Sequence, residues 1–152
     1  MTQLSGRMSR RAFVGAGSTL LAFAALGTNI VRAAGTPGLT THMLDTASGK
    51  PAEGVKIDFS VLDGSAYKLI STVQTNADGR TPAPLLTAET MKVGQYELVF
   101  YIGEYFTKLG TVLPNPPFIE KAVIQFDMAD ATSHYHVPLL ASPWSYTTYR
   151  GS

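Results

Sequence analysis

The sequence predicts an all-β domain, an antiparallel β-sandwich with one short helix. The first observation is a strict alternation over short segments, clearest where Val55, Ile57, Phe59 and Val61 interleave with mostly polar neighbours. Side chains two positions apart share one face of a strand, so this segment buries one face and exposes the other. The second observation is that turn-forming residues separate such segments about every 8–12 residues, which is typical of sandwiches.

The same alternation and turn residues define each element in order. Strands are predicted at 39–45, 55–62, 67–75, 96–100, 122–128 and 134–140. Clusters of Gly, Pro, Asn, Asp and Ser mark turns between them, at 46–51, 63–65 and 76–79. Two prolines limit residues 81–86 to a short edge strand. Residues 102–109 are the one segment of this domain that favours a helix, of about two turns.

Length and composition indicate one modest domain. The chain has 152 residues, of which 15% are charged, and it contains no cysteine. Disulfides and thiolate metal sites are therefore excluded. Residues 34–152 hold 8 Lys and Arg against 11 Asp and Glu, without a basic run. A slightly acidic domain of this kind is a poor nucleic-acid binder.

The first 33 residues have the composition of an export signal. The pair Arg10-Arg11 precedes residues 14–31, a long Ala-, Gly- and Leu-rich stretch without a charge. A basic start, an apolar middle and small residues near Ala33 are the parts of a cleavable signal, and paired arginines indicate the twin-arginine route. The alternative is a membrane anchor, because about 18 apolar residues can just span a bilayer. We expect cleavage, a periplasmic mature domain at 34–152 and no stable membrane anchor.

The C-terminus carries the most specific motifs. Residues 134–140 read HYHVPLL, and the chain ends with YRGS at 149–152. These two motifs resemble the C-terminal signature of the 5-hydroxyisourate hydrolases, the transthyretin-related enzymes of urate breakdown. LTTHMLD at 39–45 and the turn Asp78-Gly79-Arg80 resemble the same family. The resemblance covers 38–152 and implies a transthyretin-like sandwich of two four-stranded sheets, with a short helix between the fifth and sixth strands.

The resemblance also implies roles for single residues. The implied catalytic residues are His42, Arg80 and His136. The implied substrate-binding residues are His42, Arg80, Tyr149, Arg150, Gly151 and Ser152. The implied reaction is hydrolysis of 5-hydroxyisourate to 2-oxo-4-hydroxy-4-carboxy-5-ureidoimidazoline, with no cofactor and no metal.

These residue types fit such a reaction. Attack of water on a ring carbonyl needs a base of near-neutral pKa, which histidine provides. It also needs a donor for the oxyanion and a fork of donors that matches the carbonyl-bearing amide edges of a planar substrate, and the Arg80 guanidinium supplies both. An arginine beside a histidine also depresses the imidazole pKa and keeps the base unprotonated. The sequence leaves open whether His42 or His136 takes the proton.

Other interpretations of the same residues remain. A lone strand histidine, or an arginine after Asp-Gly, is most often a solvated surface residue, and His134 keeps that interpretation. A zinc site is a second alternative, because His134 and His136 share a strand face and His42 would add a third nitrogen. No acidic ligand lies at a matching spacing, and the Arg80 cation would oppose the ion. A nucleophilic serine fits poorly because the chain has no Gly-x-Ser-x-Gly elbow.

The resemblance further implies a homotetramer, a pair of dimers with sites at the dimer–dimer interface. Trp144, Tyr146 and Tyr149 near the end of the chain are residue types that favour interfaces. Transthyretin uses the corresponding channel to carry hydrophobic hormones, so a small-molecule carrier is the alternative function. A structural sandwich module is a third. Carriers of that kind lack the YRGS ending and the two histidines, so the sequence favours the hydrolase.

Overall fold

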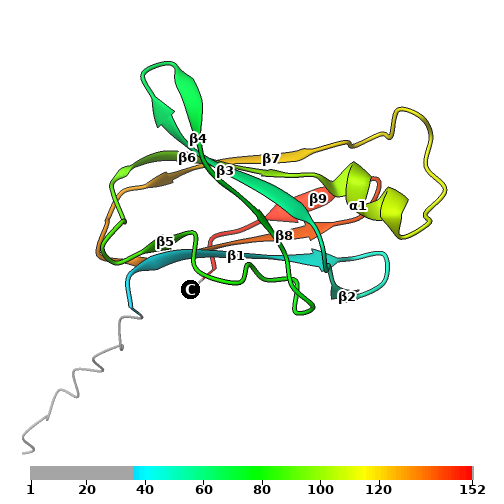
Figure 1. Cartoon of the computed structure of the whole chain (residues 1–152), viewed down its shortest axis with the longest axis horizontal. Helices are drawn as coiled ribbons and strands as arrows, with labels where there is room; N and C mark the ends of the chain where they lie inside the picture. Colours follow the sequence, from blue (N-terminus) through cyan, green and yellow to red (C-terminus); the bar gives the residue numbers. More distant parts are fainter. Residues whose placement is uncertain (1–35, 152) are drawn as a thin grey trace, which may run out of the picture. The chain divides into compact units, whose positions relative to one another are not determined.

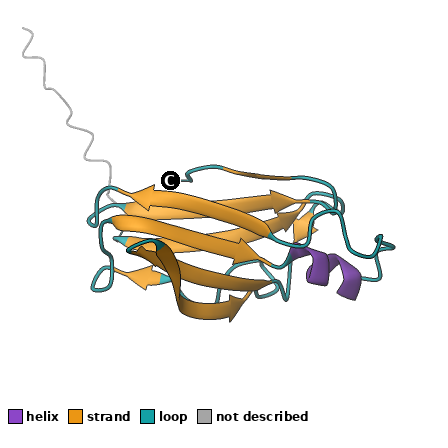
Figure 2. Cartoon of the chain, turned by 90° about the horizontal axis from the view of Figure 1, so that it is seen from above, coloured by secondary structure: helices purple, strands orange, loops and turns teal. Residues whose placement is uncertain are grey.

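A computed structural model describes residues 36–151 as two β-sheets packed face to face, with a short helix at one end (Figures 1 and 2). The predicted export signal at 1–33 and the terminal Ser152 lie outside the described residues. The first sheet has the order β2-β1-β8-β9, and β5 also pairs with β1. The second sheet has the order β4-β3-β6-β7.

The first sheet is built around two long strands. These are β1 (Gly38–Asp45) and β8 (His134–Ala141), which pair in parallel along their whole length. The other members are short: β2 (Lys50–Pro51), β5 (Leu86–Thr87) and β9 (Tyr146–Thr148). All three short strands run antiparallel to their partners. Segments far apart in the sequence therefore lie side by side at the centre of this sheet.

The second sheet is fully antiparallel. It contains β3 (Lys56–Asp63), β4 (Ala66–Gln74), β6 (Gly94–Phe100) and β7 (Ala122–Met128). The β3–β4 hairpin extends beyond the rest of the sandwich (Figure 1). The helix α1 (Ile102–Lys108) connects β6 to the loop before β7. Within the described part of the chain, no helix has the length and apolar content needed to cross a membrane.

The core lies between the two sheets. Leu39 and Met43 of β1 are fully buried, as are Phe59, Leu98 and Phe100 of the second sheet. These residues follow the predicted period of two, so apolar burial fixes which face of each strand points inward. The intervening positions of β1 and β8 are left on the outer face, and this is where the candidate site is found.

The predicted fold class is confirmed, with four differences in detail. The β1–β8 pair is parallel, a feature that strand periodicity does not reveal. The short strands β2 and β9 were not expected, because residues 50–51 belong to a turn cluster and the tail lacks alternation. The first sheet has five strands instead of four because β2 and β5 share one edge of β1. The strand expected within 81–86 is reduced to Leu86–Thr87, after the prolines.

Candidate active site

Two histidines from neighbouring strands meet on the outer face of the first sheet. In the parallel register, Thr40 lies opposite His136 and His42 lies opposite Pro138. Nδ1 of His42 lies 2.8 Å from Nε2 of His136. The ring centroids are 4.9 Å apart and the ring planes are inclined by 12°. A ring N–H lies in the ring plane, so this geometry allows one imidazole to donate to the lone pair of the other.

A threonine hydroxyl extends this pair on its other side. Oγ1 of Thr40 lies 2.8 Å from Nδ1 of His136 and 3.4 Å from Nε2 of His134. Both ring nitrogens of His136 are therefore engaged, one with Thr40 and one with His42. Thr40 was not among the site residues predicted from the sequence. The signal for it is the spacing Thr-x-His in 40–42, which places the hydroxyl and the imidazole on one face of β1.

A tight turn brings Arg80 beside His42. The side chain of Asn76 accepts hydrogen bonds from the N–H groups of Asp78 and Arg80, at 3.0 and 3.1 Å. Gly79 then adopts a φ of +70°, and its carbonyl accepts from the N–H of Met43 at 2.8 Å. A Cβ on Gly79 would collide with the Met43 carbonyl oxygen, so the turn requires glycine. The backbone of Arg80 pairs with the backbone of His42 in an antiparallel β-bridge at this edge of β1.

The tail returns along β8 to His136. After a turn at 142–145, β9 pairs with β8, and the Thr148 hydroxyl donates to the carbonyl of Pro138 at 2.8 Å. The N–H of Gly151 then donates to the carbonyl of His136 at 2.8 Å. A Cβ on Gly151 would lie only 2.7 Å from Cδ2 of His136. The tail backbone therefore packs directly against the imidazole, as only glycine permits.

The surroundings keep both imidazoles unprotonated near neutral pH. Burial, followed by the Arg80 cation, lowers the pKa of His42 below its usual value. Burial also lowers the pKa of His136 to about 4, with His42, Arg80 and His134 adding to the effect. The expected influence of Arg80 is present, but desolvation is the larger cause for both rings. A neutral imidazole can accept a proton from water, whereas an imidazolium cannot.

Two of the predicted tail residues lie elsewhere. The guanidinium carbon of Arg150 is 4.8 Å from the centre of the Tyr135 ring, within the range of a cation–π contact. Tyr149 and Arg150 line a hollow with Tyr135 and Val137, on the side of β8 opposite to the histidines. Within one chain, these two side chains therefore do not join the imidazole pair. The structure brings together His42, Arg80, His136 and the backbone of Gly151.

The zinc alternative can be compared with the arrangement of possible ligands. Among residues 36–151, no group of three or more His, Asp or Glu side chains is placed to hold a metal ion. His134 reaches the pair only through the Thr40 hydroxyl. The described part of the chain thus offers two contacting imidazoles with an adjacent cation, an arrangement suited to proton transfer.

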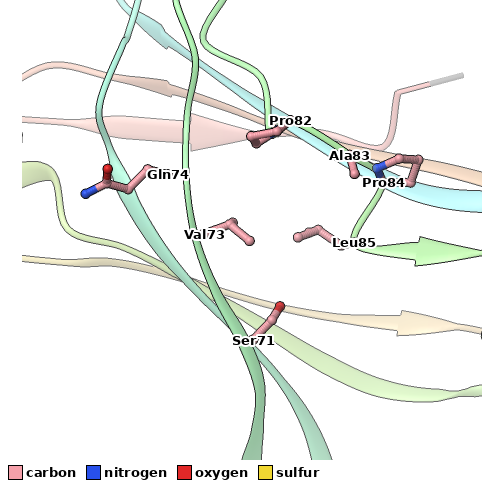
Figure 3. Close-up of a pocket in the computed structure, with 7 residues that line it drawn as sticks. All are labelled: Ser71, Val73, Gln74, Pro82, Ala83, Pro84 and Leu85. Atoms are coloured by element: carbon pink, nitrogen blue, oxygen red, sulfur yellow. The ribbon is translucent and has the colours of Figure 1, made fainter.

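A separate pocket of about 400 Å³ lies between β4 and the segment that follows Arg80 (Figure 3). Its lining comes from two segments: Ser71, Val73 and Gln74 of β4, and Pro82, Ala83, Pro84 and Leu85. None of these side chains is charged or titrates near neutral pH. The pocket therefore offers no side chain that acts as an acid or a base near neutral pH.

Comparison with known proteins identifies the family. A family model described as HIUase/Transthyretin matches residues 39–151, which is most of the chain. The chain belongs to the HIUase/transthyretin family. Within it, 5-hydroxyisourate hydrolase 2 of Rhizobium meliloti is 56% identical over 114 residues, covering 75% of this chain and 95% of the relative.

Solved structures of the HIUase/transthyretin family share the fold. The 5-hydroxyisourate hydrolase of Klebsiella pneumoniae is 34% identical with a TM-score of 0.62, covering 76% of this chain and 94% of that one. Transthyretin from Sparus aurata is 32% identical with a TM-score of 0.67, covering 75% and 96%. The two scores are close, so the sandwich alone does not separate hydrolases from transthyretins. Function has to be argued from the site.

Proposed function

We propose that this chain is a 5-hydroxyisourate hydrolase in which His42, Arg80 and His136 promote attack of water on a ring carbonyl without a metal. The observation that carries the proposal is the 2.8 Å contact between two imidazoles of lowered pKa, with the backbone of Arg80 paired to that of His42 and the Arg80 cation lowering the pKa of both rings. The relatives support the choice of substrate, because the protein of that name in Rhizobium meliloti matches along nearly its whole length.

The reaction can be written with the groups at hand. A water molecule gives one proton to an unprotonated imidazole nitrogen while its oxygen bonds to the carbonyl carbon. The carbonyl oxygen gains negative charge, which the Arg80 guanidinium stabilises. The C–N bond of the ring then breaks, and the imidazolium returns its proton to the departing nitrogen. The result is the addition of one water across a cyclic amide.

A transthyretin-like small-molecule carrier is the second candidate, favoured by the similarity to the Sparus aurata structure. A carrier needs a binding channel but no base. The lowered pKa values of His42 and His136 provide a base at neutral pH, so they favour the hydrolase. The roles of Tyr149, Arg150 and Ser152 in substrate binding stay predictions, and removal of residues 149–152 tests them together.

The deciding experiment is an ultraviolet time course on freshly made 5-hydroxyisourate, generated from urate by urate oxidase. The purified mature protein is added with and without a chelator, and the rate is compared with spontaneous decay. We expect acceleration that the chelator leaves unchanged. Loss of rate with chelator would support the zinc alternative. A folded protein that gives no acceleration would support the carrier.

We further propose a homotetramer with sites at the dimer–dimer interface. Thr40, His42, His134 and His136 are only half-buried on the outer face of β1 and β8, so a second dimer facing this surface would enclose the site. Light scattering of the mature protein at assay concentration should give the mass of four chains. A monomer that retains full activity would contradict this arrangement.

Export to the periplasm is proposed from the sequence of residues 1–33. The support is the pair Arg10-Arg11 ahead of an uncharged apolar stretch and small residues at Ala33 and Ala34. Replacing both arginines of the pair by lysine should retain the precursor in the cytoplasm. N-terminal sequencing of the exported protein should begin near Ala34.

A further inference from the structure

The Thr40 hydroxyl lies at the centre of the site but has no role in the proposed reaction. It lies across the strand pair from His136 and contacts Nδ1 of that ring at 2.8 Å. The other nitrogen of His136 contacts His42. A row of three groups results: hydroxyl, imidazole, imidazole. The direction of the hydrogen bonds along this row decides whether the last nitrogen, Nε2 of His42, carries a proton or a bare lone pair.

Only two directions are possible for neutral rings, because each neutral imidazole carries one N–H and one lone pair. If Thr40 donates to His136, then Nε2 of His136 donates to His42, and the proton of His42 sits on Nε2. If Thr40 accepts from Nδ1–H of His136, then His42 donates through Nδ1 and its Nε2 is bare. The first arrangement leaves His42 a donor, and the second makes it a base.

The end of the row has no hydrogen-bond partner among residues 36–151. No hydrogen bond in this part of the chain involves Nε2 of His42, and His42 is only half-buried. Nε2 of His42 is therefore left for a water molecule. Nδ1 of the same ring is already occupied by His136. Nε2 of His42 is thus the nitrogen of the pair at which a substrate water can lose a proton.

We propose that Thr40 is a positioning residue whose hydroxyl accepts the Nδ1–H of His136 and thereby leaves Nε2 of His42 bare as the base. Thr40 needs another acceptor for its own proton. The carbonyl oxygen of Tyr135, 3.5 Å away, can only accept, and Nε2 of His134 lies at 3.4 Å. Both are long contacts, but either takes the hydroxyl proton away from His136 and turns an oxygen lone pair toward that ring.

The Arg80 cation helps to keep the His42 ring neutral. The backbone of Arg80 pairs with that of His42 at the edge of β1 opposite to β8, and the cation lowers the pKa of His42. A cation opposes protonation of a nearby imidazole, so His42 keeps one bare nitrogen. His136, held neutral, then acts as the acceptor that orients His42. This assignment rests on the proposed hydrolysis for its catalytic meaning, but the hydrogen-bond direction is a property of the free protein.

The test combines a spectroscopic and a kinetic reading. Nitrogen-15 chemical shifts separate protonated from bare ring nitrogens, and the chain has only three histidines. At pH 7.5, wild-type His42 and His136 should both carry the proton on Nδ1, and a His134→Gln variant assigns the third ring. Thr40→Val should mix or reverse the tautomer of His136, whereas Thr40→Ser should preserve it.

The matched control is Thr41→Val in the same strand. Thr41 is fully buried on the inner face and donates to the carbonyl of Val137 at 2.6 Å, so its loss costs a hydrogen bond without touching the histidines. Thr40→Val should lower kcat about 10-fold or more with KM within about twofold. Thr40→Ser and Thr41→Val should keep both constants near wild type.

Each result decides the inference. A wild-type spectrum with His136 protonated on Nε2 would overturn it, and this holds even if Thr40→Val fails to fold. Unchanged tautomers in Thr40→Val would also overturn it, because the hydroxyl would then have only a structural role. If the protein does not accelerate decay of 5-hydroxyisourate, the proposed function fails, and the spectra still decide the hydrogen-bond direction separately.

Discussion

Replacement of Gly151 by alanine should disable the site while leaving the sandwich folded. A Cβ at this position would lie 2.7 Å from Cδ2, 3.1 Å from Cβ and 3.2 Å from Cγ of His136. Ordinary contacts begin near 3.4 Å, so the imidazole or the tail must retreat by about 0.7 Å. Cδ2 is bonded to Nε2, the atom that contacts His42 at 2.8 Å. A shift of this size away from His42 takes that contact to the limit of a hydrogen bond.

The expected magnitude follows from this displacement. Misplacement of a catalytic group by about 1 Å can cost about 100-fold in rate, so Gly151→Ala should lose between about 10-fold and 100-fold in kcat/KM. Stability should fall by about 1 kcal/mol, the net value of one hydrogen bond. The melting temperature should therefore drop by only a few degrees.

The assay is the ultraviolet decay of 5-hydroxyisourate, with circular dichroism to verify the fold. Gly94→Ala is the matched control, because a Cβ there would lie 3.7 Å from Tyr96, an ordinary contact far from the histidines. The control should keep the wild-type rate. A folded Gly151→Ala protein with full activity would show that the tail does not hold His136 in place.

Three further predictions concern the same site. His42→Ala, Arg80→Ala and His136→Ala should each lower turnover about 100-fold or more without unfolding the protein, and full activity in any of them would remove that residue from the mechanism. Between the usual imidazole pKa of about 6.5 and the folded value of about 4 for His136, the unfolded chain binds more protons, so stability should decrease as pH falls through this window. Urea titrations at several pH values should show that the free energy of unfolding depends less on pH in His136→Asn than in wild type. Equal slopes of this free energy against pH would contradict the lowered pKa of His136. Gly79→Ala should cost about 3 kcal/mol or more because of its left-handed φ and its clash with the Met43 carbonyl. Gly64→Ala, with a similar φ and open space around it, should cost about 1 kcal/mol, and equal losses would refute the close approach at Gly79.

Much of the fold could be predicted because burial imposes a period of two on each long strand. Leu39 and Met43 alternate with Thr40 and His42, and the inner members are buried as the pattern requires. The short strands β2 and β9 could not be predicted, for a physical reason. The three residues of β9 are all exposed, so no burial pattern marks them, and the strand is defined by hydrogen bonds to β8 alone.

Three members of the candidate site could be predicted from the sequence, but neither Thr40 nor the contacts among the residues could be. Motifs named His42, Arg80 and His136, but they do not contain the parallel register that puts Thr40 opposite His136. That register depends on which strands become neighbours, and no local pattern carries this information. The side chain of Arg150 illustrates the same limit, since its position in the tail does not reveal that it lies over Tyr135.

The pH dependence of kcat/KM for 5-hydroxyisourate tests the central claim, that a neutral imidazole pair takes the proton from water. Burial and Arg80 lower the pKa of His42, and burial lowers that of His136 to about 4. After subtraction of spontaneous decay, the rate constant should therefore be level near neutral pH and fall only below the usual imidazole pKa of about 6.5. A midpoint at or above about 6.5, or a rate that rises as the solution becomes more acidic, would show that a neutral imidazole of lowered pKa is not the base.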